Sequence, residues 1–307
     1  MAEFNTLKQM MDAIPDEGAA IAHFTAVRWR DGAFCPYCQG RKVYTFKDGR
    51  THKCAGCGKR FSIKVGTIFE GTKLPLRTWM LAVWMLTSHK KGIASTTLAR
   101  DLGITQKSAW FVLHRLREAA TTRSFNAPLE GTVEADETFV GGKNKNKHAH
   151  KRTGVRGQAG KAVVFGVIQR DGELRMRELW MRHIEAATAR DMQAEVKAHV
   201  KPGSAVMTDE APAFVGLQGT YTHHAVNHSA GEYVRHYTIH TNTIEGAWSQ
   251  LKRQMVGVHQ FVTDKHLSRY VAESEWLYDR RKMAEGVRTD ALIAGFDGRL
   301  RYRELIA

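Results

Sequence analysis

Long apolar runs are missing from this 307-residue sequence. The longest, such as the run from Trp79 to Leu86, are too short and too interrupted for a membrane-spanning helix, which needs about 20 apolar residues. The first residues, MAEFNTLKQMMDAIPDEG, have neither the basic start nor the apolar core of a secretion signal. Internal repeats are also missing. We therefore expect a soluble cytoplasmic protein with no membrane partner, large enough for about two domains.

Acidic residues are scarce relative to basic ones. The chain has 31 Asp and Glu against 46 Lys and Arg, which gives a formal net charge of +15. This surplus favours a polyanionic partner over a small neutral ligand, because neutralising phosphate groups releases their counterions. Nucleic acid is the first candidate, and the alternative is a basic protein with no particular partner.

Cysteine is rare as well, and all four cysteines fall in two short motifs. The motif CPYC holds Cys35 and Cys38, and CAGC holds Cys54 and Cys57, with 15 residues between the pairs. This spacing is typical of a zinc site. Two disulfides are the alternative, but a reducing cytoplasm disfavours them. Four sulfur ligands leave no open position for water, so we expect the Zn²⁺ to be structural.

The first half of the chain is expected to hold two small modules. Residues 1–72 predict a helical lead-in followed by a zinc ribbon, because KVYTFK and THKCAGCGKRFS alternate apolar and polar side chains between glycines. Residues 73–122 change to helical periodicity, with a turn at Gly103 between two amphipathic helices. This pattern predicts a helix-turn-helix DNA-binding domain, and an ordinary helical hairpin is the alternative. The second helix, residues 105–119, carries the expected DNA contacts Gln106, Lys107 and Arg115 on its polar side.

Residues 123–285 read as a single α/β domain. Three strand-like segments come first, then a helix, two more strands and a last helix. The expected strands are 131–142, 161–171, 173–180, 204–210 and 222–229, and the expected helices are 187–200 and 240–253. Together they predict a mixed five-stranded sheet flanked by helices, in the order of the ribonuclease H-like fold. The chain is therefore expected to be a multidomain α+β protein in which residues 286–307 form a C-terminal tail.

A strongly basic segment separates the first two of these strands. Residues 143–160 contain no acid, so the segment cannot bury itself and is expected to bind a phosphate backbone. The alternative is a solvated hairpin tip. The basic residues expected to contact DNA are Lys143, Lys145, Lys147, Lys151 and Arg152.

Three carboxylates are candidates for a second metal centre. Asp136 stands in an apolar strand, Asp209 ends another, and Glu245 follows Asp209 with 35 residues between them. Three converging carboxylates repel one another unless a cation joins them. Hard oxygen ligands suit Mg²⁺ or Mn²⁺, and two such ions are suited to nucleotidyl transfer. For Glu245 the alternative is a capping box with Asn242 at the start of its helix.

Other polar residues near these acids compete for roles in the same site. Glu134 should share a strand face with Asp136, and it stays open as an auxiliary metal ligand. Glu137 and Glu210 should point the opposite way from their aspartate neighbours, if the strands are regular. His240 lies close enough to Glu245 in the sequence to contact DNA or to position water.

Four stretches of the chain together resemble a known family. They are RWRDGAFCPYCQG, HKCAGCGKRFSIKVGTIFEGTKLPLRTW, VEADETFVGGK and the long segment from HTNTIEGAWSQLKR to LYDRRK. The sequence resembles the bacterial insertion-sequence transposases of the DDE class with an N-terminal zinc ribbon, the ISXO2-like group, over roughly residues 20 to 285. The zinc ribbon and the long final match are each specific, whereas the DE dipeptides alone are weak.

The resemblance implies an enzyme that moves a DNA element. Asp136 and Asp209 match the two aspartates of the family, Glu245 the third acid and Lys252 the basic residue that follows it. Some family members have an asparagine as the third ligand, which leaves Asn242 as an alternative. Mg²⁺- or Mn²⁺-dependent cleavage at the element end would free a 3′-hydroxyl that attacks target DNA.

The same resemblance implies the partners of the chain. The ribbon and the helix-turn-helix would bind the terminal inverted repeats, and Arg253 would add a DNA contact beside Lys252. A homodimer or a larger synaptic assembly is implied, associated with the bacterial nucleoid. Two other functions compete: a zinc-ribbon and helix-turn-helix DNA-binding regulator with an inactive nuclease-like domain, and a host nuclease or ribonuclease H.

Overall fold

The computed structural model divides into two compact units. The first comprises residues 1–122 and 282–307, and the second comprises residues 123–281. The structure describes residues 4–121, 128–142, 150, 161–170, 179–184, 188–209, 212–227 and 230–306. In this described part of the chain, every helix is too short or too polar to cross a membrane.

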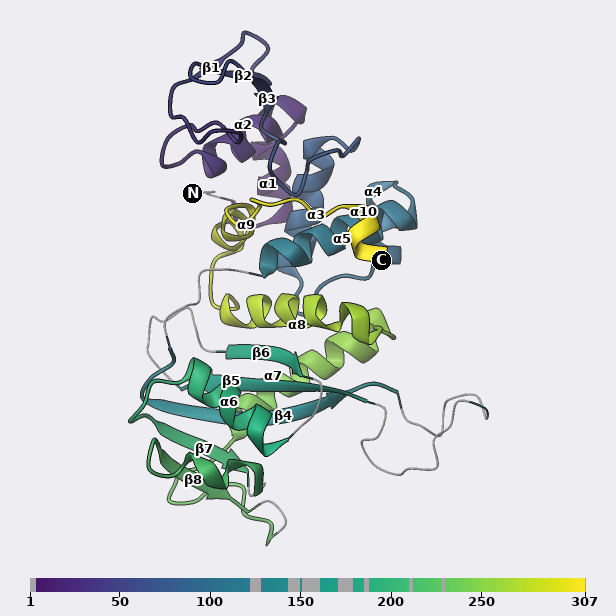
Figure 1. Ribbon diagram of the computed structural model, residues 1–307. Coiled ribbons are helices and arrows are strands. Elements are labelled where there is room, and N and C mark those ends of the chain that lie inside the picture. The colour runs from purple at the N-terminus through teal and green to yellow at the C-terminus, as the bar shows by residue number, and fades with distance from the viewer. Residues whose placement is uncertain are drawn as a thin grey trace. The chain divides into compact units, whose positions relative to one another are not determined.

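The first unit begins with two helices and a small antiparallel sheet, labelled in Figure 1. The helices are α1 (Leu7–Ala13) and α2 (Glu17–Arg28), and the strands are β1 (Val43–Thr45), β2 (Thr51–Cys54) and β3 (Arg60–Ser62). A capping box starts α1, in which the Thr6 hydroxyl accepts from the Gln9 N–H and the Gln9 side chain accepts from the Thr6 N–H. The predicted helical lead-in and short ribbon strands are both present.

Three helices follow the ribbon. They are α3 (Leu76–Ser88), α4 (Ser95–Leu102) and α5 (Gln106–Ala120). Gly103 ends α4 with φ 64°, a left-handed conformation that glycine adopts without a side-chain clash. Thr105 then caps α5, because its side chain accepts from the Ser108 N–H. The two amphipathic helices and the turn at Gly103 therefore lie where the sequence predicts them.

The C-terminal residues are not a tail. They form α9 (Glu285–Ile293) and α10 (Tyr302–Ile306), and α9 packs against α3 within the first unit. Leu292, Ile293 and Phe296 are buried there. Two polar contacts also reach back to earlier helices: His23 Nε2 lies 2.8 Å from Asp290 Oδ1, and the hydroxyls of Thr87 and Thr289 lie 3.2 Å apart. The expectation of a tail at residues 286–307 is wrong, because these apolar side chains complete the core of the first unit.

Arg115 of α5 is buried by this C-terminal segment. Its side chain donates to the carbonyl oxygens of Leu300, at 3.2 Å, and Glu70, at 3.1 Å, and only 6% of the residue is exposed. Burial lowers the pKa of Arg115 to about 10. The prediction that Arg115 contacts DNA is wrong, because its guanidinium joins parts of the fold. Gln106 and Lys107, at the start of α5, are exposed.

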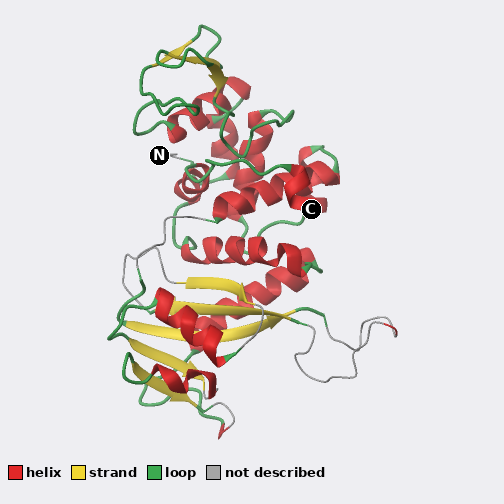
Figure 2. Ribbon diagram, in the orientation of Figure 1, coloured by secondary structure: helices red, strands yellow, loops and turns green. Residues whose placement is uncertain are grey.

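The second unit is built on a mixed sheet of five strands (Figure 2). The strands are β4 (Thr132–Val140), β5 (Ala162–Gln169), β6 (Leu179–Ile184), β7 (Ala205–Asp209) and β8 (Thr222–Val226). Their order is β6-β5-β4-β7-β8, with β4, β5 and β6 antiparallel in turn and β4, β7 and β8 parallel. This is the predicted mixed five-stranded sheet.

The described part of one strand extends beyond its predicted end. The sequence suggests residues 173–180, whereas β6 spans Leu179–Ile184 and pairs with β5 from Ile168 opposite Leu179 to Val163 opposite Ile184. Residues 173–178 lie outside the described part of the chain. Apolar and polar residues alternate only from Glu173 to Arg177, so the sequence pattern did not predict the pairing with β5 as far as Ile184.

Helices cover both faces of this sheet (Figure 1). One face is covered by α6 (Ala189–His199) and the short helix η3 (Pro212–Leu217), and the other by α7 (Asn242–Gln254) and α8 (Asp264–Asp279). Along β4 the side chains alternate, so Val133 and Ala135 pack in the core on the α6 side. Glu134 and Asp136 point to the other side, where both contact α7.

Arg115→Ala should lower the free energy of unfolding of the first unit by about 2 to 3 kcal/mol, because two buried carbonyl oxygens lose a charged donor. Denaturant unfolding followed by circular dichroism measures the change. Lys107→Ala is the matched control on the exposed side of α5, and we expect it to change stability by less than about 0.5 kcal/mol. Equal stability of the two variants would contradict a structural role for Arg115.

Candidate metal centres

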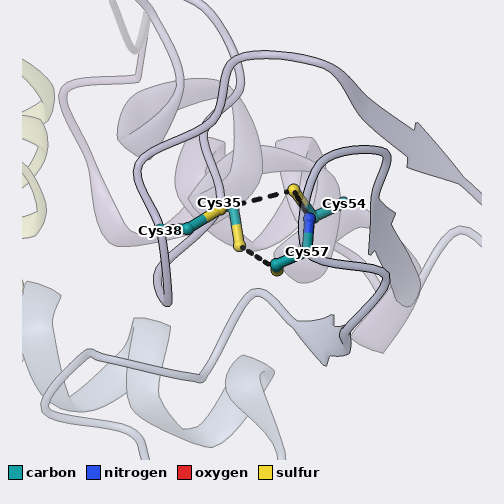
Figure 3. A group of neighbouring side chains, drawn as sticks. All are labelled: Cys35, Cys38, Cys54 and Cys57. Atoms are coloured by element: carbon teal, nitrogen blue, oxygen red, sulfur yellow. Dashed lines mark hydrogen bonds between the residues drawn. The ribbon is translucent and has the colours of Figure 1, made fainter.

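The four cysteines converge at one end of the ribbon, as Figure 3 shows. The Sγ atoms of Cys35 and Cys57 lie 3.7 Å apart, those of Cys38 and Cys54 lie 3.6 Å apart, and all four lie within 4.8 Å of one another. A tetrahedral Zn²⁺ with bonds of about 2.3 Å needs sulfur separations of about 3.8 Å. The disulfide alternative is wrong, because a disulfide needs about 2.05 Å between the sulfur atoms.

Backbone donors prepare these sulfur atoms for a cation. The Tyr37 N–H points to the Cys35 sulfur at 3.4 Å, and the Cys57 N–H points to the Cys54 sulfur at 3.5 Å. The bond from Cys57 lowers the pKa of the Cys54 thiol to about 7, which favours the thiolate that a metal binds. Donor type, number and spacing all fit a structural Zn²⁺, and no ligand position remains for catalysis.

A second candidate centre lies on the α7 side of the main sheet. Strands β4 and β7 run parallel and pair up to Glu134 opposite Met207. Two residues further along each strand, Asp136 and Asp209 come to the same level and point to the same side. Asp136 lies within β4, which continues to Val140, whereas Asp209 is the last residue of β7. Asp136 and Asp209 are therefore neighbours on adjacent strands.

The electrostatics of this pair favour a cation. Burial, together with the neighbouring charges of Glu137 and Asp209, raises the pKa of Asp136 to about 7, although a hydrogen bond from Trp248 opposes the rise. Burial also raises the pKa of Glu137, again with a contribution from Asp209. Carboxylates this close hold protons unless a positive charge joins them, so the donor set fits a divalent metal. Among the described residues only the cysteines bring three ligand atoms within 4.8 Å of one another.

Glu245 lies in the first turns of α7, but the helix starts differently from the prediction. The N-cap is Thr241 rather than Asn242, and it makes no side-chain bond to a helix N–H. The hydroxyl of Thr241 instead donates to Glu245 Oε1 at 3.0 Å. The predicted capping box is therefore wrong in register and in donor. In this structure Glu245 is turned toward the start of its own helix, and the side chain of Asn242 is exposed.

Two hydrogen bonds, which we call the β4–α7 clamp, fix α7 to β4 on either side of Glu245. The N–H of Ile244 donates to Glu134 Oε2 at 2.9 Å, and the indole N–H of Trp248 donates to Asp136 Oδ2 at 2.8 Å. The two acceptors are two residues apart on a strand, about 6.7 Å, and the two donors are four residues apart on a helix, about 6 Å. The clamp therefore matches strand and helix spacing and holds the turn of α7 that carries Glu245 against β4.

Glu134 belongs to a structural network rather than to the ligand set. Its carboxylate is completely buried, and Oε1 accepts from Arg170 Nε at 2.5 Å and lies 3.2 Å from His240 Nδ1. The same guanidinium donates to the backbone oxygens of Thr238 and His240. Both oxygens of Glu134 are thus engaged, the other one by Ile244. This opposes the open alternative of Glu134 as an auxiliary ligand and places His240 in the same network.

The remaining predicted contacts are distributed over both units. Lys252 and Arg253 are exposed on α7, and Lys252 follows Glu245 by two turns, about 10 Å along the axis. In the first unit, Gln106 donates to the Ser95 hydroxyl at 3.0 Å, and Lys107 lies over the ring of Tyr302 at 4.9 Å. The predicted basic contacts Lys143, Lys145, Lys147, Lys151 and Arg152 lie outside the described residues.

Sequence reasoning missed the polar role of Trp248 and the anchoring role of Glu134. Trp248 belongs to the apolar stripe of α7 and is 4% exposed, so the sequence pattern assigns it to the core. A buried indole N–H usually finds an acceptor, which is the one signal that would have pointed to a polar partner. The identity of that partner depends on how α7 docks on the sheet.

Comparisons with known proteins match a segment of each unit to a transposase domain. Residues 128–279 match a family model described as the ISXO2-like transposase domain, and residues 15–60 match a transposase zinc-ribbon domain. A relative described as an uncharacterized protein in transposable element ISH50 of Halobacterium salinarum is 27% identical over 266 residues, 80% of this chain and 85% of that protein. A chain from the crystal structure of a pre-cleavage Mos1 transpososome aligns at 13% identity over 76% of this chain and 82% of that one. Its TM-score of 0.26 is too low to show a common fold.

The purified protein should contain one Zn²⁺ per chain, measured by inductively coupled plasma mass spectrometry. Cys54→Ser should lose this metal and lower the melting temperature of the first unit, because a buried thiolate ligand is removed. Tyr37→Phe is the matched control, since it changes an exposed side chain between two ligands and should retain the zinc. If the purified wild-type protein contains no zinc, the assignment of a structural zinc site is contradicted.

Trp248→Phe should make the second centre bind Mg²⁺ only at higher pH. The variant keeps a buried ring but deletes the donor that stabilises the charged form of Asp136, so the pKa of Asp136 should rise above about 7. Calorimetric titration with Mg²⁺ from pH 6 to pH 9 should show weaker binding near neutral pH and recovery toward pH 9.

The control for this prediction is Trp276→Phe. Trp276 lies on α8 in the same unit and is 2% exposed, but its indole N–H has no hydrogen-bond partner in the described part of the chain. We expect its Mg²⁺ binding to follow the wild-type pH dependence. A loss in Trp248→Phe that higher pH does not restore would indicate disrupted packing instead of an altered carboxylate.

Proposed function

The chain belongs to the ISXO2-like transposases with an N-terminal zinc ribbon, and we propose that it cleaves DNA at the ends of an insertion element and joins them to target DNA. Membership in a family with a DDE transposase domain implies a polynucleotidyl transferase. The proposal adds the individual steps, the residues that carry them and the DNA that is recognised.

The observation that carries this proposal is the pair of crowded aspartates. Asp136 and Asp209 stand side by side on parallel strands, and Asp136 has a pKa raised to about 7 by burial and by its acidic neighbours. A protein gains no stability from such a pair, so the arrangement is better explained by cation binding. Glu245 would be the third ligand, because the β4–α7 clamp holds its turn of α7 against the strand that carries Asp136.

Asp136, Asp209 and Glu245 would hold Mg²⁺ or Mn²⁺ ions, and a two-ion site fits their number and charge. When bound, such ions activate the attacking oxygen and stabilise the leaving oxygen of a phosphodiester. Glu245 would have to leave the Thr241 hydroxyl to complete the site.

The cations of the chain would hold the DNA. Lys252 is exposed on α7, two turns beyond Glu245, where it can bind a phosphate near the scissile bond as a point charge. Arg253 beside it offers a second phosphate contact. In the first unit, the exposed start of α5, with Gln106 and Lys107, would contact the terminal inverted repeats. The segment with Lys143, Lys145, Lys147, Lys151 and Arg152 would bind the backbone outside these contacts.

The proposed reaction consists of two transfers at the same carboxylates. In the first, water attacks the phosphodiester at the element end, the P–O bond to the 3′-oxygen breaks, and a 3′-hydroxyl is freed. In the second, that hydroxyl attacks a phosphodiester of target DNA, and a new strand junction forms as a 3′-oxygen leaves. Joining two ends in one event requires two active sites, so a homodimer or larger assembly is part of the proposal.

Asp136→Asn should reduce Mg²⁺-dependent cleavage of a duplex carrying the element end to below about 1% of wild type, because an amide is a poor ligand for this cation. Asp209→Asn should do the same. Binding of that duplex, measured by fluorescence anisotropy in Ca²⁺, should remain within about twofold, since the first unit is unchanged. Asp12→Asn, on the exposed surface of α1, is the control and should cleave normally.

Asp136→Asn should also stabilise the metal-free protein at pH 8. The folded-state pKa of Asp136 is raised above the unfolded value near 4, so its stabilising contribution is present below about pH 4 and is lost as the pH rises through about 7. Removing the charge should therefore raise stability by up to about 4 kcal/mol in EDTA, with no gain at pH 4. Retained cleavage together with no gain would overturn the assignment of Asp136. Normal DNA binding with no cleavage by the wild type would favour the regulator alternative.

A further inference from the structure

A tight hairpin at residues 235–239 lies directly before α7. The backbone groups of Arg235 and Ile239 bond to each other in both directions, at 2.8 and 2.9 Å, and the Thr238 N–H donates to the Arg235 oxygen at 3.3 Å. At its tip, His236 has φ 49° and Tyr237 has φ 63°. Two consecutive non-glycine residues therefore have a left-handed backbone conformation. A turn of this kind normally has Asn-Gly at these two positions.

This conformation is strained for both residues. A side chain in the left-handed region places its Cβ close to the backbone, and bulky residues seldom adopt it. Across the part of the chain that the structure describes, only Gln39 and Gln260 are other non-glycine residues with positive φ. Strain of this kind persists where the surrounding structure holds it and is common at functional sites.

The base of the hairpin is held firmly. Arg235 donates to both carboxylate oxygens of Glu232, at 2.7 and 2.6 Å, and Ile239 is buried against Met207 and Val226. Arg170 donates to the backbone oxygen of Thr238, on the other side of the tip. These contacts hold the backbone of the hairpin on both sides of its tip.

The tyrosine at the tip contributes nothing to the core. Tyr237 is 96% exposed, the largest exposed fraction among the exposed large apolar side chains of the described residues. Its strain is therefore not offset by packing within the chain. A glycine at this position would fit the backbone better, so the side chain itself needs another explanation.

The base of the hairpin contacts the face of the sheet that carries the proposed catalytic carboxylates. Ile239 packs against Met207, two residues before Asp209 on β7. The guanidinium of Arg170 contacts the backbone oxygen of Thr238 and the carboxylate of Glu134. Glu134 lies two residues before Asp136 on the same face of β4. Because Tyr237 adjoins Thr238, the hairpin that carries its exposed ring is anchored on the sheet face of Asp136.

We propose that Tyr237 stacks on a base that has left the DNA helix next to the scissile phosphate. The inference rests on the proposed function and adds to it the state of the DNA that the site accepts. An exposed, fixed aromatic ring offers a face for stacking and no charge for a phosphate. Within a duplex both faces of each base are covered by neighbouring pairs, so the partner of the ring must be unstacked. The chain's charge of +15 supports a nucleic-acid occupant.

The test compares two DNA duplexes that carry the same element end, one fully paired and one with three unpaired bases beside the cleavage position. Wild-type protein should bind the unpaired duplex more tightly, in Ca²⁺ so that no cleavage occurs. Tyr237→Gly removes the ring and relieves the strained backbone, so it should weaken that binding about tenfold while its melting temperature stays equal or rises. Tyr237→Phe keeps the ring and should bind within about twofold of wild type.

The salt dependence separates stacking from charge. Because Tyr237 carries no charge, the slope of log affinity against log salt concentration should be unchanged in Tyr237→Gly. Equal binding of the unpaired duplex by Tyr237→Gly and wild type would overturn the inference. So would a changed oligomeric state of Tyr237→Gly in sedimentation analysis, since the ring would then belong to an interface between copies of the chain.

Failure of the proposed function would look different. If wild-type protein prefers the unpaired duplex through Tyr237 but never cleaves DNA in Mg²⁺, the stacking inference stands and the catalytic proposal fails. If wild-type protein cleaves and Tyr237→Gly binds and cleaves both duplexes equally well, the catalytic proposal stands and the stacking inference fails.

Discussion

The β4–α7 clamp is the constraint on which the second unit depends. It pairs a buried strand carboxylate, Glu134, with a backbone N–H at the start of α7, and a helix indole, Trp248, with the first aspartate of the site. A helix start normally needs a side-chain cap, and here Glu134 from the sheet supplies the acceptor that Thr241 does not. The contact between Glu134 and Ile244 therefore satisfies a backbone N–H at the start of α7 and also fixes the position of α7 on the sheet.

The same contact explains how a stable fold carries an electrostatically costly site. Asp136 is buried beside other carboxylates, which raises its pKa to about 7, and the Trp248 donor offsets part of that penalty. Glu134 avoids the same fate because Arg170 and His240 lie against one oxygen and Ile244 donates to the other. Two acids on one strand face thus differ in role: Glu134 is fully engaged within the fold, while Asp136 keeps capacity for a cation.

Much of this architecture follows from local patterns in the sequence. The cysteine spacing gave the ribbon, the turn at Gly103 gave the two helices, and the change of period after residue 122 gave the mixed sheet. The sequence-based predictions were wrong where contacts between residues far apart in the chain determine the structure. Arg115 lies on the polar side of its helix by sequence, yet residues near position 300 fold over it. The third strand continues to Ile184, beyond its predicted end at residue 180, where it pairs with β5.

By itself, the sequence determined the zinc ligands, the order of helices and strands, and the three acids proposed for the second centre, because spacing and periodicity are properties of neighbouring residues. Only the tertiary structure decided which partner each polar group has. Glu134 meets Ile244 across 110 positions, and Asp136 meets Trp248 across 112. No periodic sequence pattern extends over such separations. The docking of α7 on the sheet therefore decided the partners of Glu134 and Asp136, and the Tyr237 hairpin precedes that helix.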